Sequence, residues 1–156
     1  MAITDQKLLT FSLGKEGYGV SILKVKEIIG MLEITPVPRT PEFIKGVINL
    51  RGKIIPVMDL RLKFGMEPQE YNERTCIIVA EVAINGNQRL IGVVVDMVSE
   101  VVNITSDQIE PAPEYGMSVE HNFILGIGKL KDRVVIIIDI EEVFLCDEII
   151  KMLESV

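Results

Sequence analysis

The sequence predicts a mainly β protein that consists of two packed copies of one β-rich unit. An internal repeat supports this prediction: residues 18–29 align without a gap on residues 91–102, and residues 46–60 align on residues 126–140. Strand-length apolar segments separated by turn residues support it as well. Two copies indicate two modules packed on each other, because a solenoid would need at least three repeats.

The matched positions of the repeat carry similar side chains. The pairs are Gly19 with Gly92, Ile22 with Val95, Val25 with Val98, Glu27 with Glu100, Ile28 with Val101, Gly46 with Gly126, Leu50 with Leu130, Ile55 with Val135, Val57 with Ile137 and Asp59 with Asp139. A duplicated unit makes two related surfaces with a groove between them, which points first to a binding protein.

The first unit opens with two predicted strands. Residues 7–13 alternate weakly and predict an N-terminal strand, and a second strand starts at Tyr18 after a Gly-Lys-Glu-Gly turn. Ile22, Val25 and Ile28 then recur every three residues, a spacing that fits either one helical turn or a twisted strand edge. Periodicity alone does not choose between these two.

A proline-rich segment follows. Residues 34–41 hold three prolines, so they predict a stiff loop rather than a central strand or a helix interior. Thr40 as the N-cap and Pro41 at the first helical position then predict a short helical turn.

The first unit closes with a hairpin and a capped helix. Residues 47–58 predict two apolar strands around a turn at residues 51–53. Asp59 is expected to cap a short helix that ends near Gly65.

The second unit begins with another hairpin. Residues 76–84 and 90–96 predict strands joined at Asn85 and Gly86, because Asn-Gly between apolar strands is the strongest short-range hairpin signal. The polar run of residues 103–122 predicts the longest loop of the chain.

The last predicted elements are a hairpin and a C-terminal helix. Residues 123–130 and 133–139 predict the hairpin, with a turn at Lys131 and Asp132. Asp139 stands three residues before Glu142, a pattern like a capping box, and an apolar stripe predicts a helix over residues 140–153.

Composition fits a small cytoplasmic protein. A chain of 156 residues suits one ordinary domain or two small barrels that stabilise each other. No apolar run reaches the roughly 18 residues of a membrane-spanning helix, and no basic segment precedes an apolar one as in a secretory signal. Cys76 and Cys146 lie outside any CxxC pattern, so we expect buried, reduced thiols.

The charge argues against a nucleic-acid partner and is divided unevenly along the chain. The net charge is −7, whereas nucleic-acid affinity comes largely from Lys and Arg. Residues 1–72 carry ten Lys and Arg against eight Asp and Glu, and residues 73–156 carry six against fifteen. The net charges are +2 and −9. Either this is a drift of solvated surface charge, or opposite ends face oppositely charged neighbours in a head-to-tail assembly.

No catalytic or metal-binding constellation is visible in the sequence. The single histidine, His121, lies in the polar loop, where a solvated side chain is the usual explanation. GxSxG, P-loop and Rossmann glycine motifs are absent. Asp59 and Asp139 recur at matching places before helix-forming residues, which favours capping over a carboxylate pair. We therefore expect no cofactor, no metal and no enzyme activity.

Two charged residues within apolar segments are the candidates for binding. Glu27 interrupts one apolar segment, and Arg51 lies at the tip of a hairpin. Glu27 could equally be an outward-facing strand residue and Arg51 an ordinary turn residue, because the second unit has a Glu and a Lys at the matching places. Val25 and Ile28 beside Glu27 fit either the core or an apolar groove rimmed by charge.

The segments YGVSILKVKEI, FIKGV and NLRG-x-IIPV-x-DLR resemble the CheW family of bacterial chemotaxis coupling proteins. The resemblance extends along nearly the whole chain. It implies one CheW-like domain over residues 1–156, with two five-stranded SH3-like β-barrels packed side by side. The barrels would occupy approximately residues 14–72 and 73–140, flanked by the strand at 7–13 and the helix at 140–153.

The resemblance implies a non-catalytic adaptor that joins the cytoplasmic tips of chemoreceptors to the regulatory domain of the histidine kinase CheA. The protein would then work in the cytoplasm at membrane-associated receptor arrays, without inserting into the membrane. One alternative is the CheW-like module of a CheV-type coupling protein. An alternative from another class is a small β-barrel enzyme or nucleic-acid binder.

The resemblance also implies a receptor-binding groove between the barrels. Carried over residue by residue, its candidates are Ile22, Val25, Glu27, Ile28, Gly46, Arg51, Gly92 and Val98. Gly46, Gly92 and Val98 are candidates for close approach or for lining the groove. Contacts with the kinase are expected at the barrel ends.

Overall fold

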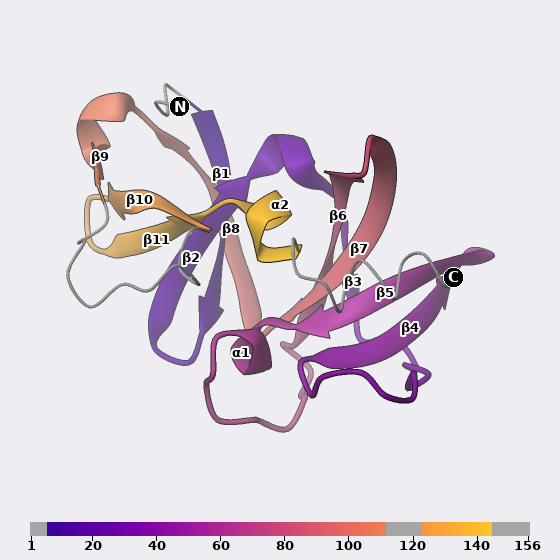
Figure 1. Ribbon diagram of the computed structural model, residues 1–156. Coiled ribbons are helices and arrows are strands. Elements are labelled where there is room, and N and C mark those ends of the chain that lie inside the picture. Colours follow the sequence, from indigo (N-terminus) through magenta and orange to yellow (C-terminus); the bar gives the residue numbers. More distant parts are fainter. Residues whose placement is uncertain (1–5, 112–122, 145–156) are drawn as a thin grey trace.

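The computed structural model describes residues 6–111 and 123–144 and confirms the mainly β class (Figure 1). The strands are β1 (Gln6–Leu13), β2 (Glu16–Ser21), β3 (Val25–Gly30), β4 (Ile44–Leu50), β5 (Lys53–Asp59), β6 (Cys76–Ile84), β7 (Asn87–Val95), β8 (Met97–Ile104), β9 (Ile109–Glu110), β10 (Ile124–Lys129) and β11 (Val134–Ile138). The helices are η1 (Ile22–Lys24), α1 (Leu60–Lys63), η2 (Ser106–Gln108) and α2 (Ile140–Phe144).

These strands form two sheets that lie side by side (Figure 1). The six-stranded sheet has the order β8-β1-β2-β11-β10-β9, and the five-stranded sheet has the order β3-β6-β7-β5-β4. Most neighbours are antiparallel, but β11 pairs in parallel with β2, and β5 pairs in parallel with β7. Helix α2 follows β11 and lies against β6 of the other sheet, so it joins the two.

The internal repeat of the sequence is a repeat of the structure. Gly19 pairs with Ile137 in one sheet, and the matching Gly92 pairs with Val57 in the other. The amides of Asp59 and Asp139 both donate at 2.7 Å to the carbonyl of the phenylalanine sixteen residues before, so both hairpins close in the same way.

The two units are interleaved between the two sheets. The first unit gives β1 and β2 to the six-stranded sheet and β3, β4 and β5 to the five-stranded sheet. The second unit gives β6 and β7 to the five-stranded sheet and its remaining strands to the other. Residues 14–72 and 73–140 therefore do not correspond to the two sheets. The connections after β2 and β7 each lead from one sheet to the other. Because the two units have similar sequences, the sequence does not show whether a strand pairs with a strand of its own unit or of the other unit.

Most local predictions are confirmed. β1 covers the expected strand, and the Asn85-Gly86 turn joins β6 to β7. Asp59 accepts from the backbone N–H of Leu62 at 3.3 Å and caps α1. The three-residue spacing after Tyr18 resolves into the short helix η1 followed by strand β3.

Three local expectations were wrong. The expected helical turn at Pro41 does not form. The Ile44 N–H donates to the Pro41 carbonyl and closes a single turn before β4. The Thr40 hydroxyl donates to the Val37 carbonyl instead of capping a helix. The polar run after residue 102 contains the end of β8, then η2 and β9. Cys76 is half-buried, and its thiol donates to the Arg74 carbonyl.

Several expectations fall outside the described residues. These are the positions of His121 and Cys146, the remainder of the expected loop from residue 112, and the C-terminal helix beyond Phe144.

A shared core joins the sheets, and each sheet has a smaller core of its own. The shared cluster includes Phe11, Ile78 and Phe144, each 2% exposed or less. Ile48 and Ile77 belong to a cluster within the five-stranded sheet, and Leu8 and Val135 to one within the six-stranded sheet. The large shared cluster packs side chains of the two sheets against each other.

Tyr71 supports the cap of α1, and we expect it to make the unfolding free energy depend on alkaline pH. Its hydroxyl donates to Asp59 Oδ2 at 2.8 Å, and Asp59 is buried. Burial, followed by this hydrogen bond, raises the pKa of Tyr71 above its ordinary value. A raised folded-state pKa stabilises the protein below the unfolded pKa of about 10, and this contribution is lost as pH rises above it.

Tyr71→Phe should therefore flatten the fall of the unfolding free energy above pH 10. At neutral pH the variant should be about 1 kcal/mol less stable, because Asp59 loses one hydrogen bond. Urea denaturation at pH 7, 9, 10 and 11 measures both effects. If the unfolding free energies of the wild type and the variant fall equally steeply above pH 10, this role of Tyr71 is contradicted.

Candidate protein-binding groove

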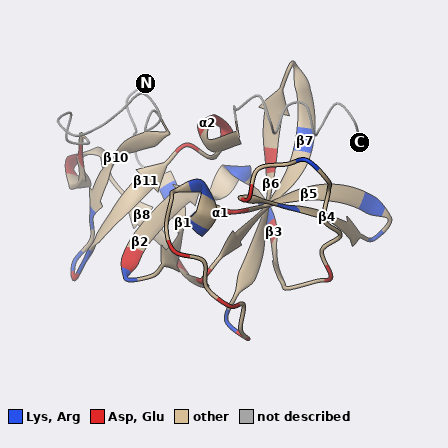
Figure 2. Ribbon diagram, turned by 60° about the horizontal axis from the view of Figure 1, so that its bottom comes forward, with Lys and Arg blue, Asp and Glu red and all other residues tan. Residues whose placement is uncertain are grey.

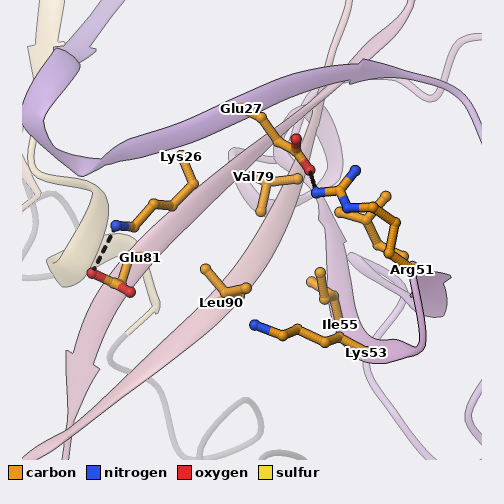
Figure 3. Close-up of a pocket in the computed structure, with 9 residues that line it drawn as sticks. Lys26, Glu27, Arg51, Lys53, Ile55, Val79, Glu81 and Leu90 are labelled. Atoms are coloured by element: carbon orange, nitrogen blue, oxygen red, sulfur yellow. Dashed lines mark hydrogen bonds and ion pairs between the residues drawn. The ribbon is translucent and has the colours of Figure 1, made fainter.

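A groove of about 490 Å³ lies over the five-stranded sheet (Figure 3). Its lining residues come from β3, β4, β5, β6, β7 and the β4–β5 turn: Lys26, Glu27, Leu50, Arg51, Lys53, Ile55, Val79, Glu81 and Leu90. The described lining therefore belongs to one sheet, whereas the sequence resemblance implied a groove between two barrels.

An ion pair crosses one end of the groove. Arg51 Nη2 donates to Glu27 Oε1 at 2.5 Å and thereby joins the edge strand β3 to the β4–β5 turn. The Arg51 side chain is 70% exposed and that of Glu27 31% exposed. Exposed pairs contribute at most about 1 kcal/mol to stability, so this pair chiefly orients two side chains at the surface.

The turn geometry holds Arg51 at this rim. Arg51 has a φ of 52° and the next residue, Gly52, a φ of 87°. The Gly52 N–H donates to the Asn49 side chain at 2.9 Å, which fixes the turn. Two left-handed residues at a hairpin tip match the right-handed twist of the strands.

The floor is apolar and its far side carries a second ion pair. Ile55, Val79 and Leu90 lie between the two pairs in Figure 3. Lys26 and Glu81 approach to 3.4 Å on the other side. An apolar floor with a charged rim is the usual anatomy of a protein-binding surface.

Glu27 and Arg51 are the two predicted residues that line this groove. Ile22 and Val25 pack against the shared core. Ile28 is 42% exposed, but it is not among the residues that line the groove.

The two predicted glycines and Val98 lie in packed positions and are not among the residues that line the groove. A Cβ on Gly46 would come within 2.0 Å of the Thr35 carbonyl oxygen, and one on Gly92 within 2.9 Å of Ile77. Val98 packs against the shared core. The expectation of close approach fits both glycines, and the groove lining does not include them.

The site residues predicted from the sequence did not include the other seven lining residues: Lys26, Leu50, Lys53, Ile55, Val79, Glu81 and Leu90. Glu81 and Leu90 are partners across the β6–β7 hairpin, and β6 pairs with β3. The two-residue spacing of Val79 and Glu81 places them on one strand face. That spacing was the available signal, but it does not show which strand lies beside β6.

A second cavity involves different residues. About 570 Å³ in volume, it lies between α1 and the six-stranded sheet, where the rings of Phe64 and Phe123 stack at 4.8 Å. Its described lining is Tyr18, Lys63, Phe64, Gly65, Met66, Phe123, Ile124 and Ile136, which includes none of the predicted binding residues.

Within residues 6–111 and 123–144, no cluster of three His, Cys, Asp or Glu side chains could hold a metal ion. No helix in these same ranges is both long and apolar enough to cross a membrane.

Comparison with known proteins identifies the family. A family model described as a CheW-like domain matches residues 7–146. The chain belongs to the CheW family. It is 46% identical over 143 residues to the chemotaxis protein CheW of Klebsiella aerogenes, a match that covers 92% of this chain and 84% of that protein.

Two further CheW proteins resemble this chain, one compared by sequence and one by structure. A probable chemotaxis protein CheW of Rhizobium etli is 36% identical over 140 residues, which covers 90% of this chain and 88% of that protein. The crystal structure of the scaffolding protein TtCheW from Thermoanaerobacter tengcongensis matches with a TM-score of 0.80 and 39% identity, covering 94% of this chain and 96% of that one. The described fold is therefore that of a CheW scaffold.

Proposed function

We propose that this CheW-family protein is a non-catalytic adaptor that couples chemoreceptor cytoplasmic tips to the histidine kinase CheA. The observation that carries the proposal is the groove over the five-stranded sheet, with Glu27 and Arg51 paired at its rim. The relatives support it, since they are chemotaxis proteins and one is described as a scaffolding protein.

The receptor tip is assigned to the groove over the five-stranded sheet. The half-buried side chains of Leu50 and Leu90 offer apolar contact to a helical segment, and the two ion pairs suit its polar flanks. Because Arg51 is largely exposed, its guanidinium can contact a partner without unfolding the hairpin.

The kinase is assigned to another part of the surface. A coupling protein must bind both partners at once, so the CheA regulatory domain is placed at the barrel ends, away from the groove. Receptor tips lie on the cytoplasmic face of the membrane, which places the adaptor in the cytoplasm at receptor arrays.

A binding assay with purified partners tests the proposal. Immobilised protein should retain a receptor cytoplasmic fragment and the CheA regulatory domain, and saturation with one should not release the other. A duplex oligonucleotide at physiological salt serves as the probe for the alternative class. Retention of the oligonucleotide but of neither protein would contradict the adaptor.

Asp139→Ala separates folding from receptor binding. The Asp139 carboxylate accepts from the Glu141 N–H at 3.0 Å at the start of α2, outside the groove lining. The variant should lose about 1 kcal/mol of unfolding free energy through the lost cap. Its receptor-fragment affinity should stay within twofold of wild type, measured by calorimetry at a temperature where both are folded. A large affinity loss would place receptor contacts near α2.

A further inference from the structure

Within residues 6–111 and 123–144, three ion pairs join the two units, and all three take their cation from the first unit. These are Lys24–Glu141, Lys26–Glu81 and Arg61–Asp96, with distances of 2.5, 3.4 and 2.6 Å. The acidic partner always comes from the second unit. The unequal net charges of the two halves of the sequence, +2 and −9, therefore correspond to ion pairs between the two units.

The split does not separate the two sheets. Each sheet contains strands of both units, and Figure 2 shows basic and acidic segments in both. A head-to-tail assembly is thus not needed to give the charge division a structural role.

A duplicated chain has a competing fold. In the observed arrangement β8 pairs with β1 and β11 pairs with β2, both across units. Since β3 and β5 are the repeat equivalents of β8 and β11, the first unit could in principle close on itself with β3 beside β1 and β5 beside β2. We call this the closed-unit arrangement, in contrast to the observed interleaved one.

Apolar packing distinguishes poorly between these arrangements. The parallel contact of Val57 with Gly92 would become a contact of Val57 with Gly19, which natively faces Ile137. Because the exchanged side chains are glycine for glycine and valine for isoleucine, similar area is buried either way.

The charges do distinguish them. Arg61 and Glu141 occupy matching places at the start of α1 and α2, and Asp96 aligns on Leu23, one residue before Lys24. Each helix residue contacts the crossing connection next to its sheet, but the two ion pairs have opposite polarity. In the closed-unit arrangement, Arg61 would face Lys24 and Glu141 would face Asp96.

The third pair adds to the effect. Lys26 and Glu81 face each other across β3 and β6, and the matching positions hold Ser99 and Ser12. The closed-unit arrangement would leave both charges opposite serines, so this attraction would be lost.

We infer that the segregation of charge between the repeated units selects the interleaved fold over the closed-unit one. Single exposed pairs contribute little to stability. Here, however, two attractive pairs of the interleaved fold are replaced by two repulsive pairs in the closed-unit arrangement. We expect this difference to favour the interleaved fold about tenfold.

Exchanging one pair tests this inference. Lys24→Glu combined with Glu141→Lys keeps an ion pair in the interleaved fold. It also lets Arg61 and Asp96 find opposite charges in the closed-unit arrangement. Urea denaturation should show equilibrium stability close to wild type. Double-jump refolding measures the fraction of native chains from the amplitude of their slow unfolding phase. The fraction of refolded chains that lack this phase should be about tenfold larger in the double variant than in the wild type.

Reversing the other pair as well provides the matched control. Adding Arg61→Glu and Asp96→Arg restores opposite polarity to the two sites, and refolding should return to the wild-type yield. The inference is overturned if the double variant refolds like wild type. It is equally overturned if the fourfold variant refolds no better than the double variant, because the effect would then be local to Lys24 and Glu141.

Discussion

Arg51→Asp should weaken binding to a receptor cytoplasmic fragment by about 2 kcal/mol or more, roughly 30-fold, with little change in folding stability. The substitution places a carboxylate beside Glu27, where the wild type has an ion pair at the groove rim. Stability should change by no more than about 0.5 kcal/mol, because the side chain is largely exposed and Asp tolerates positive φ. Calorimetry and thermal melting measure the two quantities.

Arg133→Asp is the matched control. Arg133 pairs with Glu100 at 3.3 Å on the six-stranded sheet, and Glu100 is the repeat equivalent of Glu27. The charge change is the same, but the residue is outside the groove lining. Its receptor affinity should stay near wild type. If Arg51→Asp binds the receptor normally or unfolds the protein, Arg51 belongs to the hairpin alone.

Gly46→Ala should destabilise the fold by about 3 kcal/mol or more. Gly46 has a φ of 140°, and a Cβ there would lie 2.0 Å from the Thr35 oxygen and 2.6 Å from its carbon. Both obstacles are backbone atoms, held by the Thr35–Val47 bridge, so a side-chain rotation cannot relieve the clash. Urea denaturation at neutral pH measures the loss.

Gly52→Ala separates the clash from backbone strain. Gly52 also has a positive φ, 87°, but a Cβ there meets no atom within 4 Å. Its substitution should cost about 1 kcal/mol. Equal losses for the two variants would show that conformational strain, not the approach of the Thr35 backbone, accounts for Gly46.

The sequence was informative where structure is local. The Asn85-Gly86 hairpin and the Asp59 cap depend on residues close together in the chain, and both are confirmed. The repeat predicted two related β-rich units packed on each other. It could not predict the interleaving, because Gly19 and Gly92 offer nearly the same surface to either parallel partner.

The candidate site, too, was predictable from the sequence only where the signal is local. Glu27 and Arg51 were found because charge is unusual within apolar segments, and the structure brings them together. Glu81 and Leu90 reach the groove through the pairing of β6 with β3, which has no local signature. Val25 was equally compatible with core and groove, and it packs against the core.

Kinase activity in a reconstituted array tests the coupling role most directly. Receptor fragments on vesicles and CheA would be combined with no adaptor, with the wild-type protein, or with the Arg51→Asp variant, and autophosphorylation would be followed with and without attractant. We expect receptor control of the kinase only with the wild-type protein, and loss of that control with the variant although it still binds CheA. Attractant control of the same size without the protein would contradict the adaptor role.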